Sequence, residues 1–544
     1  MTLYLFNPEL LTTNTVPDDD DIRRIRQICA EHLQNLHRMN TQIERLQASL
    51  DAITSKRDAL QSKLSSLQSI TSPLRTFPTE VLQSVFMNCL ELFPVISAHE
   101  APLLLTRICS RWRSVAIGTP ALWTSFHVAL IGAKHPFESY NSTCNAIRCG
   151  LQTFLLRSDP LPLNISLHSG RHSLGLYNED IISEIDRTLE ILIPHHKRWR
   201  CINLQFPARC MTSVEHLKGE KLLNLETAVI HCFGDDMLSQ YTTMSPSPFF
   251  ENAPRLRRLS IKARDRTVMF KLIGSASWAQ LTHLIISFSY WESSPRPLQD
   301  LVSLLKACAN LEECCIKHPA IDLEGFSTTD LLILPKLKKI AIDFLFSSRA
   351  TIRLLDVLVL PELKELVLGG DVIRRNSHVS LISSIANFIK RSSCLMSQFG
   401  FTEGNRPSER TSPWDVEHTT SLLQLMPELN TLNLSYTHLM TEDLLEAFSA
   451  VSPDSEEILC PKLARIEFED SPSITGQTLV HFLSTRLSPT SSSIEPLDCV
   501  VIKDARPSSD TFLSQFGDSV QFSTPWHAGS SHIDQDFNRP EKMF

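Results

Sequence analysis

The chain has 544 residues, of which 42% are hydrophobic, 21% charged and 7% aromatic, and its formal net charge is −8. This length exceeds what one hydrophobic core supports, so we expect at least two domains. The mildly acidic balance gives no electrostatic reason to expect nucleic acid or an anionic membrane as a partner. Glycine is scarce, at 16 residues, which argues against glycine-rich phosphate loops.

The 14 cysteines include no CxxC pair. We therefore expect buried free thiols, with neither a metal nor another cofactor. The first residues lack a basic segment and lead into four aspartates, residues 18–21, so no secretory signal is expected. No apolar run approaches the ~20 residues that cross a bilayer. These features predict an intracellular protein, in the cytoplasm or the nucleus.

After a flexible N-terminus, residues 1–19, the sequence repeats every seven residues. With Ile22 as position a, the a and d positions are filled, in chain order, by Ile22, Ile25, Cys29, His32, Leu36, Met39, Ile43, Leu46, Leu50, Ile53, Arg57, Leu60, Leu64 and Leu67. Only His32 and Arg57 break the apolar series. A period of 3.5 residues sustained this long predicts a coiled coil over residues 20–70. We expect a homodimer through this segment; the alternative is a helix that folds back on its own chain.

Residues 73–127 predict three short helices. Pro78 suits the first turn of a helix, whose apolar stripe comprises Val81, Leu82, Val85, Phe86 and Cys89. A second helix is expected from Pro102 to Ala116, with inward-facing Leu104, Leu105, Ile108, Cys109, Trp112 and Val115. Pro120 starts the third, which carries Leu122 and Trp123. Such short helices bury little surface alone, so they need a partner or an adjoining domain.

This segment resembles the F-box motif, in the form common in mushroom-type fungi. The matching blocks are Phe77-Pro78-x-Glu80-Val81-Leu82, Val85-Phe86, Ile108-Cys109-x-Arg111-Trp112-Arg113 and Pro120-x-Leu122-Trp123. Phe77 departs from the leucine that is more frequent in the family, and the link from Glu91 to Ala101 is long. The resemblance implies docking to a Skp-type adaptor protein and, through it, to a cullin-based ubiquitin ligase. It assigns to this docking, directly or in support, Phe77, Pro78, Val81, Leu82, Val85, Phe86, Ile108 and Trp112. The alternative is a helical cap on the next domain that binds no adaptor.

From about residue 150 the pattern L-x-x-L-x-L recurs, with conservative replacements, at intervals of 25 to 34 residues. Its instances begin at Trp199, Leu225, Leu256, Leu281, Leu311, Leu337, Leu363, Met396, Leu429, Leu463 and Leu497. Helical stretches such as 298–305 and 442–448 precede the strands, and an edge strand at Leu163, Ile165 and Leu167 is expected to open the array. A strand and a helix per unit of this length is the leucine-rich-repeat period. The residues predict an α/β leucine-rich-repeat solenoid, a right-handed arc, over 150–503, followed by a mostly disordered tail over 505–544.

The leucines of each unit form the core, so function is expected at the positions between them, on the concave face. The charged candidates there are Arg258, Lys262, His283, Lys317, Asp343, Glu467 and Glu469. They mix both signs, with more basic residues early and more acidic residues late. That mixture favours a specific protein partner, here an unknown protein substrate, over a polyanion.

No common catalytic motif is present: the sequence contains no GxxxxGK[ST], GxGxxG, HExxH or GxSxG. We therefore predict a protein that is not an enzyme. The first interpretation is the substrate-recognition adaptor of an SCF-type (Skp–cullin–F-box) ubiquitin ligase. The alternative is a non-ligase leucine-rich-repeat scaffold that self-associates through its coiled coil. Capture of a Skp-type adaptor distinguishes the two.

Overall fold

The computed structural model describes residues 8–130, 137–169, 179–214, 217, 220–233, 250, 252–263, 278–288, 297–318, 330–344, 348–370, 378–403, 416–434, 440–449, 459–469, 474–489, 494–503 and 520–523. The chain divides into two compact units, Met1–Ser84 and Val85–Phe544. Helix α2, Thr79–Asn88, runs across this boundary. The two units are described separately.

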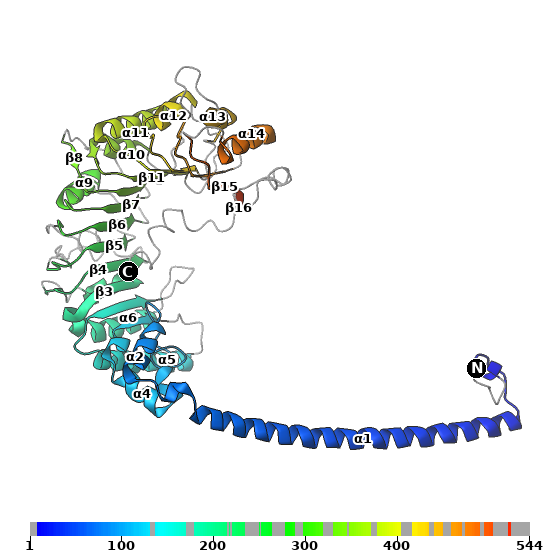
Figure 1. Cartoon of the computed structure of the whole chain (residues 1–544). Helices are drawn as coiled ribbons and strands as arrows, with labels where there is room; N and C mark the ends of the chain where they lie inside the picture. The colour runs from blue at the N-terminus through cyan, green and yellow to red at the C-terminus, as the bar shows by residue number, and fades with distance from the viewer. Residues whose placement is uncertain are drawn as a thin grey trace. The chain divides into compact units, whose positions relative to one another are not determined.

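The first unit is dominated by one long helix, α1, which spans Asp19–Ile70 (Figure 1). The short 3-10 helices η1, Pro8–Leu11, and η2, Pro73–Arg75, lie on either side of it in the chain. The carboxylate of Asp18 caps the helix by accepting a hydrogen bond of 2.6 Å from the backbone N–H of Asp21. Acidic residues in the first turn favour this start, because they face the positive end of the helix dipole. The predicted helical segment, residues 20–70, is confirmed.

The second unit is an α/β structure built on a large parallel sheet of 14 strands (Figure 1). In spatial order the strands are β1 Ser125–Ala129, β2 Leu163–His168, β3 Trp199–Pro207, β4 Thr227–Phe233, β5 Arg258–Ala263, β6 His283–Phe288, β7 Glu313–His318, β9 Lys339–Phe344, β11 Glu365–Gly370, β12 Gln398–Glu403, β13 Thr431–Leu434, β14 Arg465–Glu469, β15 Cys499–Lys503 and β16 Val520–Ser523. A separate pair comprises β8, Leu332–Ile333, and β10, Leu358–Val359. Because β1 and β16 stand at opposite ends of the order, the sheet does not close into a barrel.

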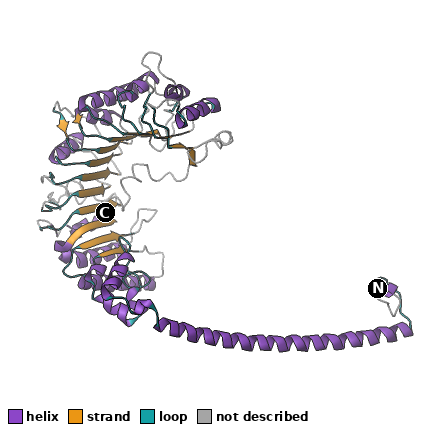
Figure 2. Ribbon diagram, viewed as in Figure 1, coloured by secondary structure: helices purple, strands orange, loops and turns teal. Residues whose placement is uncertain are grey.

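Helices connect the strands and cover one face of the sheet (Figure 2). They are α3 Leu105–Ile108, α4 Ser110–Ile117, η3 Pro120–Trp123, α5 Phe137–Arg157, α6 Glu179–Leu192, η4 Ile193–Arg198, η5 Ala208–Cys210, α7 Met211–Val214, α9 Pro297–Ala307, α10 Ser348–Val357, α11 His378–Ser392, α12 Val416–Leu423, α13 Glu442–Ser449 and α14 Gly476–Leu487. From α10 to α14 each helix contacts the next. The expected helices at 298–305 and 442–448 are confirmed as α9 and α13.

Every predicted L-x-x-L-x-L pattern lies where the structure has a strand, and most of these repeats build the same turn before it. The N–H of Leu256 donates to the carbonyl of Ala253 at 3.1 Å, and Leu281 repeats this bond to Trp278 at 2.9 Å. The second and third leucine positions then point to one side and are buried, as Leu259 shows in β5. Successive strand residues alternate sides, so we call this side the back face. The front face carries the residues between the leucines.

Three buried or half-buried arginines connect neighbouring strand-and-helix repeats of the second unit by hydrogen bonds. Arg486 of α14 is fully buried, and its guanidinium donates to the carbonyls of Leu459, at 3.2 Å, and Cys460, at 2.9 Å. Arg391 and Arg198 similarly donate to backbone carbonyls more than 30 residues earlier in the chain. Each arginine thereby donates charge-assisted hydrogen bonds to carbonyls of the preceding repeat.

The sheet is longer at both ends than the sequence predicted. Its first strand is β1, and not the strand at 163–167, which is β2. Residues before β1 extend this edge further, since Val95 bridges His127. At the other end β16 pairs with β15 inside the predicted tail; the remainder of 505–544 lies outside the described residues.

The second predicted helix of the F-box-like segment is in fact two helices. Cys109 interrupts the run from Pro102 to Ala116 with an extended backbone, φ −156° and ψ 170°. Its Sγ instead caps α4 by accepting a hydrogen bond of 3.4 Å from the N–H of Trp112. Ile108 and Cys109 are consequently exposed, against the prediction that they face inward.

Within the part of the chain that the structure describes, no helix is both long and apolar enough to cross a membrane.

Candidate docking segment and partner-binding face

Helix α2 separates its apolar residues onto two faces. Leu82 and Phe86, one turn apart, are fully buried, whereas Val81 and Val85, also one turn apart, are 43% and 40% exposed. The sequence analysis placed all four on one stripe, but successive residues differ by about 100° around a helix. Pro78 precedes the helix and accepts its first hydrogen bond, from the N–H of Leu82 at 3.1 Å. Leu82 and Phe86 therefore contribute to the core, whereas the two valines are exposed and can contact a partner.

In the second unit, other apolar side chains near α2 in sequence also remain exposed. Ile108 at the end of α3 is 55% exposed. Further exposed members between Val85 and Ile117 are Met87, Leu92, Leu104 and Ile117. Trp112 is half-buried, and its ring packs on Phe86 with centroids 5.0 Å apart. Phe77, in the first unit, is half-buried as well. Of the residues assigned to docking, Pro78, Val81, Val85 and Ile108 are thus accessible.

Trp123 attaches these helices to α5. It is fully buried, and its indole N–H donates to the carbonyl of Ala116 at 2.8 Å. Its ring meets Phe154 of α5 edge-on at 5.0 Å, and the guanidinium of Arg157 lies 4.4 Å from the ring centroid. The Pro120-x-Leu122-Trp123 block therefore serves packing, since Leu122 is fully buried too.

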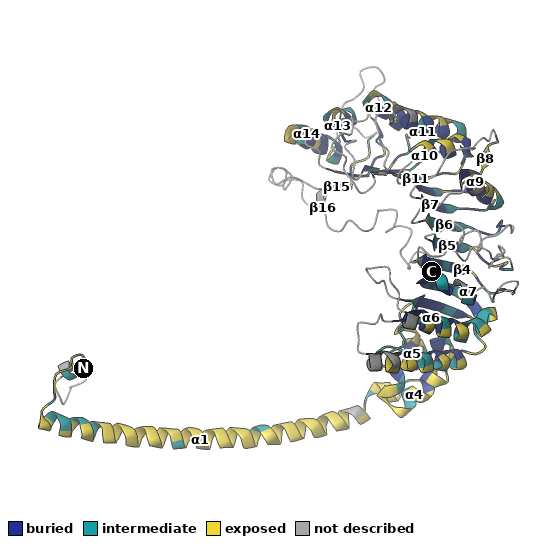
Figure 3. Ribbon diagram, turned by 180° about the vertical axis from the view of Figure 1, so that it is seen from behind, coloured by how far each residue is buried: buried dark blue, intermediate teal, exposed yellow. Residues whose placement is uncertain are grey.

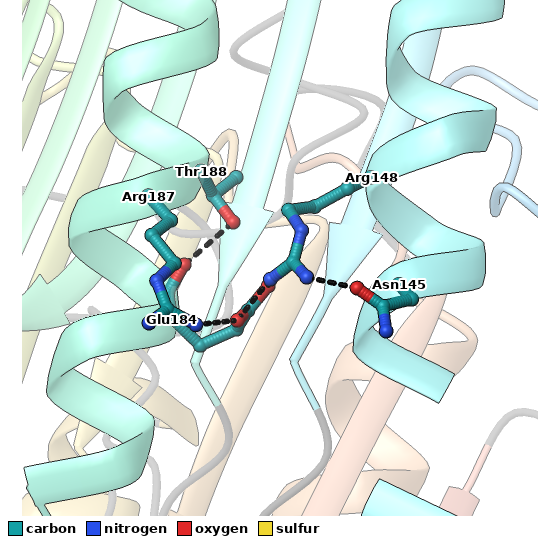
Figure 4. A network of polar contacts seen from close by, with 5 residues as sticks. All are labelled: Asn145, Arg148, Glu184, Arg187 and Thr188. Atoms are coloured by element: carbon teal, nitrogen blue, oxygen red, sulfur yellow. Dashed lines mark hydrogen bonds and ion pairs between the residues drawn. The ribbon is translucent and has the colours of Figure 1, made fainter. Parts of the chain in front are cut away.

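A polar network connects α5 with α6 beside this anchor (Figure 4). The carboxylate of Glu184 is almost wholly buried and pairs with the guanidinium of Arg148. Arg187, one turn further along α6, approaches the same carboxylate at 3.7 Å. Asn145 accepts a second hydrogen bond from Arg148. A buried carboxylate is tolerated only with such partners, so the network is a structural connection between the two helices.

Front-face residues of β5 to β11 align in three rows, because the strands pair without a register shift. The first row consists of Arg258, His283, Glu313, Lys339 and Glu365, of which the last three alternate in charge. Lys339 pairs with Glu365 at 2.6 Å, and His283 lies 3.6 Å from Glu313. The pKa of Glu313 lies below its usual value, first because of the hydrogen-bonding contact from His283, and also because Lys339 and Arg258 are positive. Burial opposes this shift.

The middle row is apolar, which the sequence analysis missed. It runs through Val229, Ser260, Ile285, Cys315, Ala341, Val367 and Gly400. Ile285, Cys315 and Ala341 are buried and form a cluster against which Val229 and Val367 pack. This apolar row could have been predicted from the third residue of each expected strand, but the sequence analysis considered only charged residues on the front face.

The third row contains three more of the charged residues that the sequence analysis assigned to partner binding, namely Lys262, Lys317 and Asp343. Lys262, Ser287, Lys317 and Asp343 follow each other in register across β5, β6, β7 and β9. Gly369 comes next, beside Asp343. A Cβ at Gly369 would lie 2.9 Å from Cγ of Asp343, so the glycine leaves room for this carboxylate.

The predicted set does not form one site. Glu467 lies on β14, buried and hydrogen-bonded by the side-chain amide of Asn433 at 3.2 Å. Four strand spacings separate β14 from β9, which is about 19 Å at ~4.8 Å per strand. The side chain of Glu469 lies outside the described residues. The front face therefore carries a mixed-charge region on β5 to β11 and a distinct acidic position on β14.

Among the residues described, no group of three or more His, Cys, Asp or Glu side chains could hold a metal ion. Burial raises the pKa of several thiols, among them Cys232 and Cys308, to about 12, which keeps them protonated. Comparison with known proteins gives no family model that matches the chain, and no curated protein matches it significantly.

Proposed function

We propose that this chain is a substrate-recognition adaptor of an SCF-type ubiquitin ligase and is not itself an enzyme. Residues 73–127 dock a Skp-type adaptor protein, and the front face of the sheet binds a protein substrate. The observation that carries the proposal is the exposure of Val85 and Ile108, two positions at which the F-box resemblance expects contact. Large apolar side chains left in solvent are characteristic of protein-binding surfaces.

The second unit serves in this proposal as a leucine-rich-repeat arc. Support comes from one strand per L-x-x-L-x-L unit, all strands parallel, with helices on the back face. In such repeats the strand residues between the buried leucines form successive rows on the open face of the sheet, where a partner can bind. A chain with this role would act inside the cell, in the cytoplasm or the nucleus, where cullin-based ligases work.

The front face suits a protein substrate through its arrangement of rows. Ile285, Cys315 and Ala341 of the middle row are already buried, so the charged residues on either side of this row are the positions that remain for a partner. Because Lys339 and Glu365 neutralise each other, the face offers specific pairing positions and not a uniform field. A polyanion would need uncompensated positive charge along its length.

Adaptor docking is tested with the purified full chain and a purified Skp-type adaptor, using titration calorimetry. Replacing Val85 and Ile108 together by glutamate should weaken binding roughly a hundredfold or more, since central apolar contacts contribute about 2 kcal/mol each. The matched control is Leu395→Glu, because Leu395 is 68% exposed and far from the segment in sequence. Variants of Leu82 or Phe86 are unsuitable, since both side chains are buried and their loss would unfold the segment.

Unchanged binding by the double variant would assign docking to other residues. If the wild-type chain captures no Skp-type adaptor, the ligase proposal is wrong. The alternative, a non-ligase scaffold that self-associates through α1, would then take its place. The exposed heptad seam of α1 is the observation that favours it.

A further inference from the structure

The long helix α1 carries an apolar seam that nothing in its own unit covers among the described residues. Nine of its a and d residues are more than half exposed: Leu36, Met39, Ile43, Leu46, Leu50, Ile53, Leu60, Leu64 and Leu67 (Figure 3). The seam follows the 3.5-residue period over most of a helix 52 residues long. Such a line of side chains requires another helix with the same period.

We propose that the occupant is a second copy of this chain, whose α1 pairs in parallel and in register. The area is sufficient: burying nine such side chains on each helix, at roughly 80 Å² apiece, removes about 1,400 Å² in total. Specific protein pairs bury about 1,200–2,000 Å². This inference goes beyond adaptor docking and does not depend on it.

The flanking positions favour the parallel direction. In a parallel pair each g residue faces the e residue five positions later on the other helix. The resulting pairs are Asp21 with Arg26, Ile28 with Leu33, Asn35 with Asn40, Gln42 with Gln47, Ser49 with Thr54, Lys56 with Gln61 and Lys63 with Gln68. One pair joins opposite charges, one is apolar, two join amides and one joins hydroxyls, while in the last two a lysine faces a glutamine. No like charges face each other at these flanking positions.

The antiparallel arrangement fits less well. It aligns each a position with a d position, and then Ile28 faces Lys63 while Leu33 faces Thr54. Its one advantage is that Arg57 lies opposite His32, so two polar residues share a layer. In the parallel pair Arg57 faces its own copy, but Asp58 on the same helix accepts hydrogen bonds from its Nε at 2.8 Å and its Nη2 at 2.5 Å. The charge is thus compensated within each chain.

A parallel dimer has a consequence for binding. Both chains leave the coiled coil from the same end, so two copies of the front face act on one assembly. A substrate with two recognition segments would gain avidity from this, by up to about 10²–10⁴-fold.

Cys29 at an a position reports the direction directly. In a parallel, in-register pair the two Cys29 thiols face each other. In the antiparallel pair Cys29 faces Leu60, and the second Cys29 lies about 46 Å away at 1.5 Å per residue. Full-length chain at micromolar concentration is first sized by light scattering and then oxidised with copper phenanthroline. We expect twice the mass of one chain and, by peptide mapping, a Cys29–Cys29 disulfide that Cys29→Ser abolishes.

Two variants complete the test. With Leu60→Cys added, a parallel pair gives only 29–29 and 60–60 links, whereas an antiparallel pair gives 29–60. Leu46→Glu, in the seam, should yield monomers, while Ala48→Glu, two residues away and outside it, should leave the dimer intact. A monomeric wild type, a larger oligomer or a 29–60 link overturns the proposal. Adaptor capture by Leu46→Glu is measured separately, so loss of pairing and loss of docking are distinguished.

Discussion

Replacing Trp123 with alanine should detach the helices before β1 from α5. The side chain is fully buried, donates to the carbonyl of Ala116 and packs on Phe154. Truncating a buried tryptophan costs about 3–5 kcal/mol through lost contacts and the remaining cavity. The lost hydrogen bond to Ala116 and the lost cation–π contact with Arg157 act in the same direction, so we expect about 4 kcal/mol or more.

The loss is measured by hydrogen exchange and mass spectrometry on the full chain, because a protein of this size need not unfold in one step. Peptides covering η3, β1 and α5 should exchange about a thousandfold faster, while those covering β9 to β15 stay unchanged. Trp123→Phe keeps the aromatic contact and loses the hydrogen bond, so about 1–2 kcal/mol is expected. The reasoning fails if alanine costs less than about 1 kcal/mol, or if phenylalanine costs as much as alanine.

Three further outcomes are expected. Arg486→Met removes a donor from the carbonyls of Leu459 and Cys460, of which the second still accepts from the N–H of Leu463. It should lower the opening free energy of α14 by about 1–3 kcal/mol in hydrogen exchange; a smaller effect contradicts this role of Arg486. Burial lowers the pKa of His127, and His168 lowers it further, while Glu100 opposes the shift. The neutral form of His127 therefore stabilises the fold above pH 6.5. This stabilisation is lost as the pH falls below that value. His127→Gln should flatten the acid dependence of exchange in β1. Gly369→Ala should force Asp343 to move and lower the denaturation midpoint by the equivalent of about 1–3 kcal/mol, whereas a neutral result would show that the carboxylate has room.

The strand array could be predicted from the sequence because its signal is periodic and local. Each L-x-x-L-x-L pattern fixes which side of a strand is apolar, as Leu259 and Ile261 do in β5. The same holds for α1, whose bounds follow from the heptads and from Asp18. β1 and β16 were missed since short strands at the ends of the array carry little of the pattern, and their pairing depends on neighbours distant in sequence.

The candidate sites were less predictable, for physical reasons. An apolar stripe does not reveal which half of it is buried, so Val85 and Phe86 could not be separated before α2 was placed. The break at Cys109 depends on a side chain that caps the next helix, which no periodicity reports. On the front face, strand order and register decide which of the predicted charged residues lie close together. Lys317 and Asp343 are neighbours, whereas Glu467 is several strands away.

The two sets of apolar residues between Val85 and Trp123 bear on the choice between a docking segment and a simple helical cap. A cap would be expected to bury its large apolar side chains against the rest of its unit, as Trp123 does against α5. Here Phe86, Leu105 and Leu122 are buried while Val85 and Ile108 remain in solvent. Exposing Val85 and Ile108 to water is unfavourable, and a segment that served only as a cap would gain nothing from it. The division favours a segment whose core residues attach it to the sheet and whose remaining apolar residues await a partner.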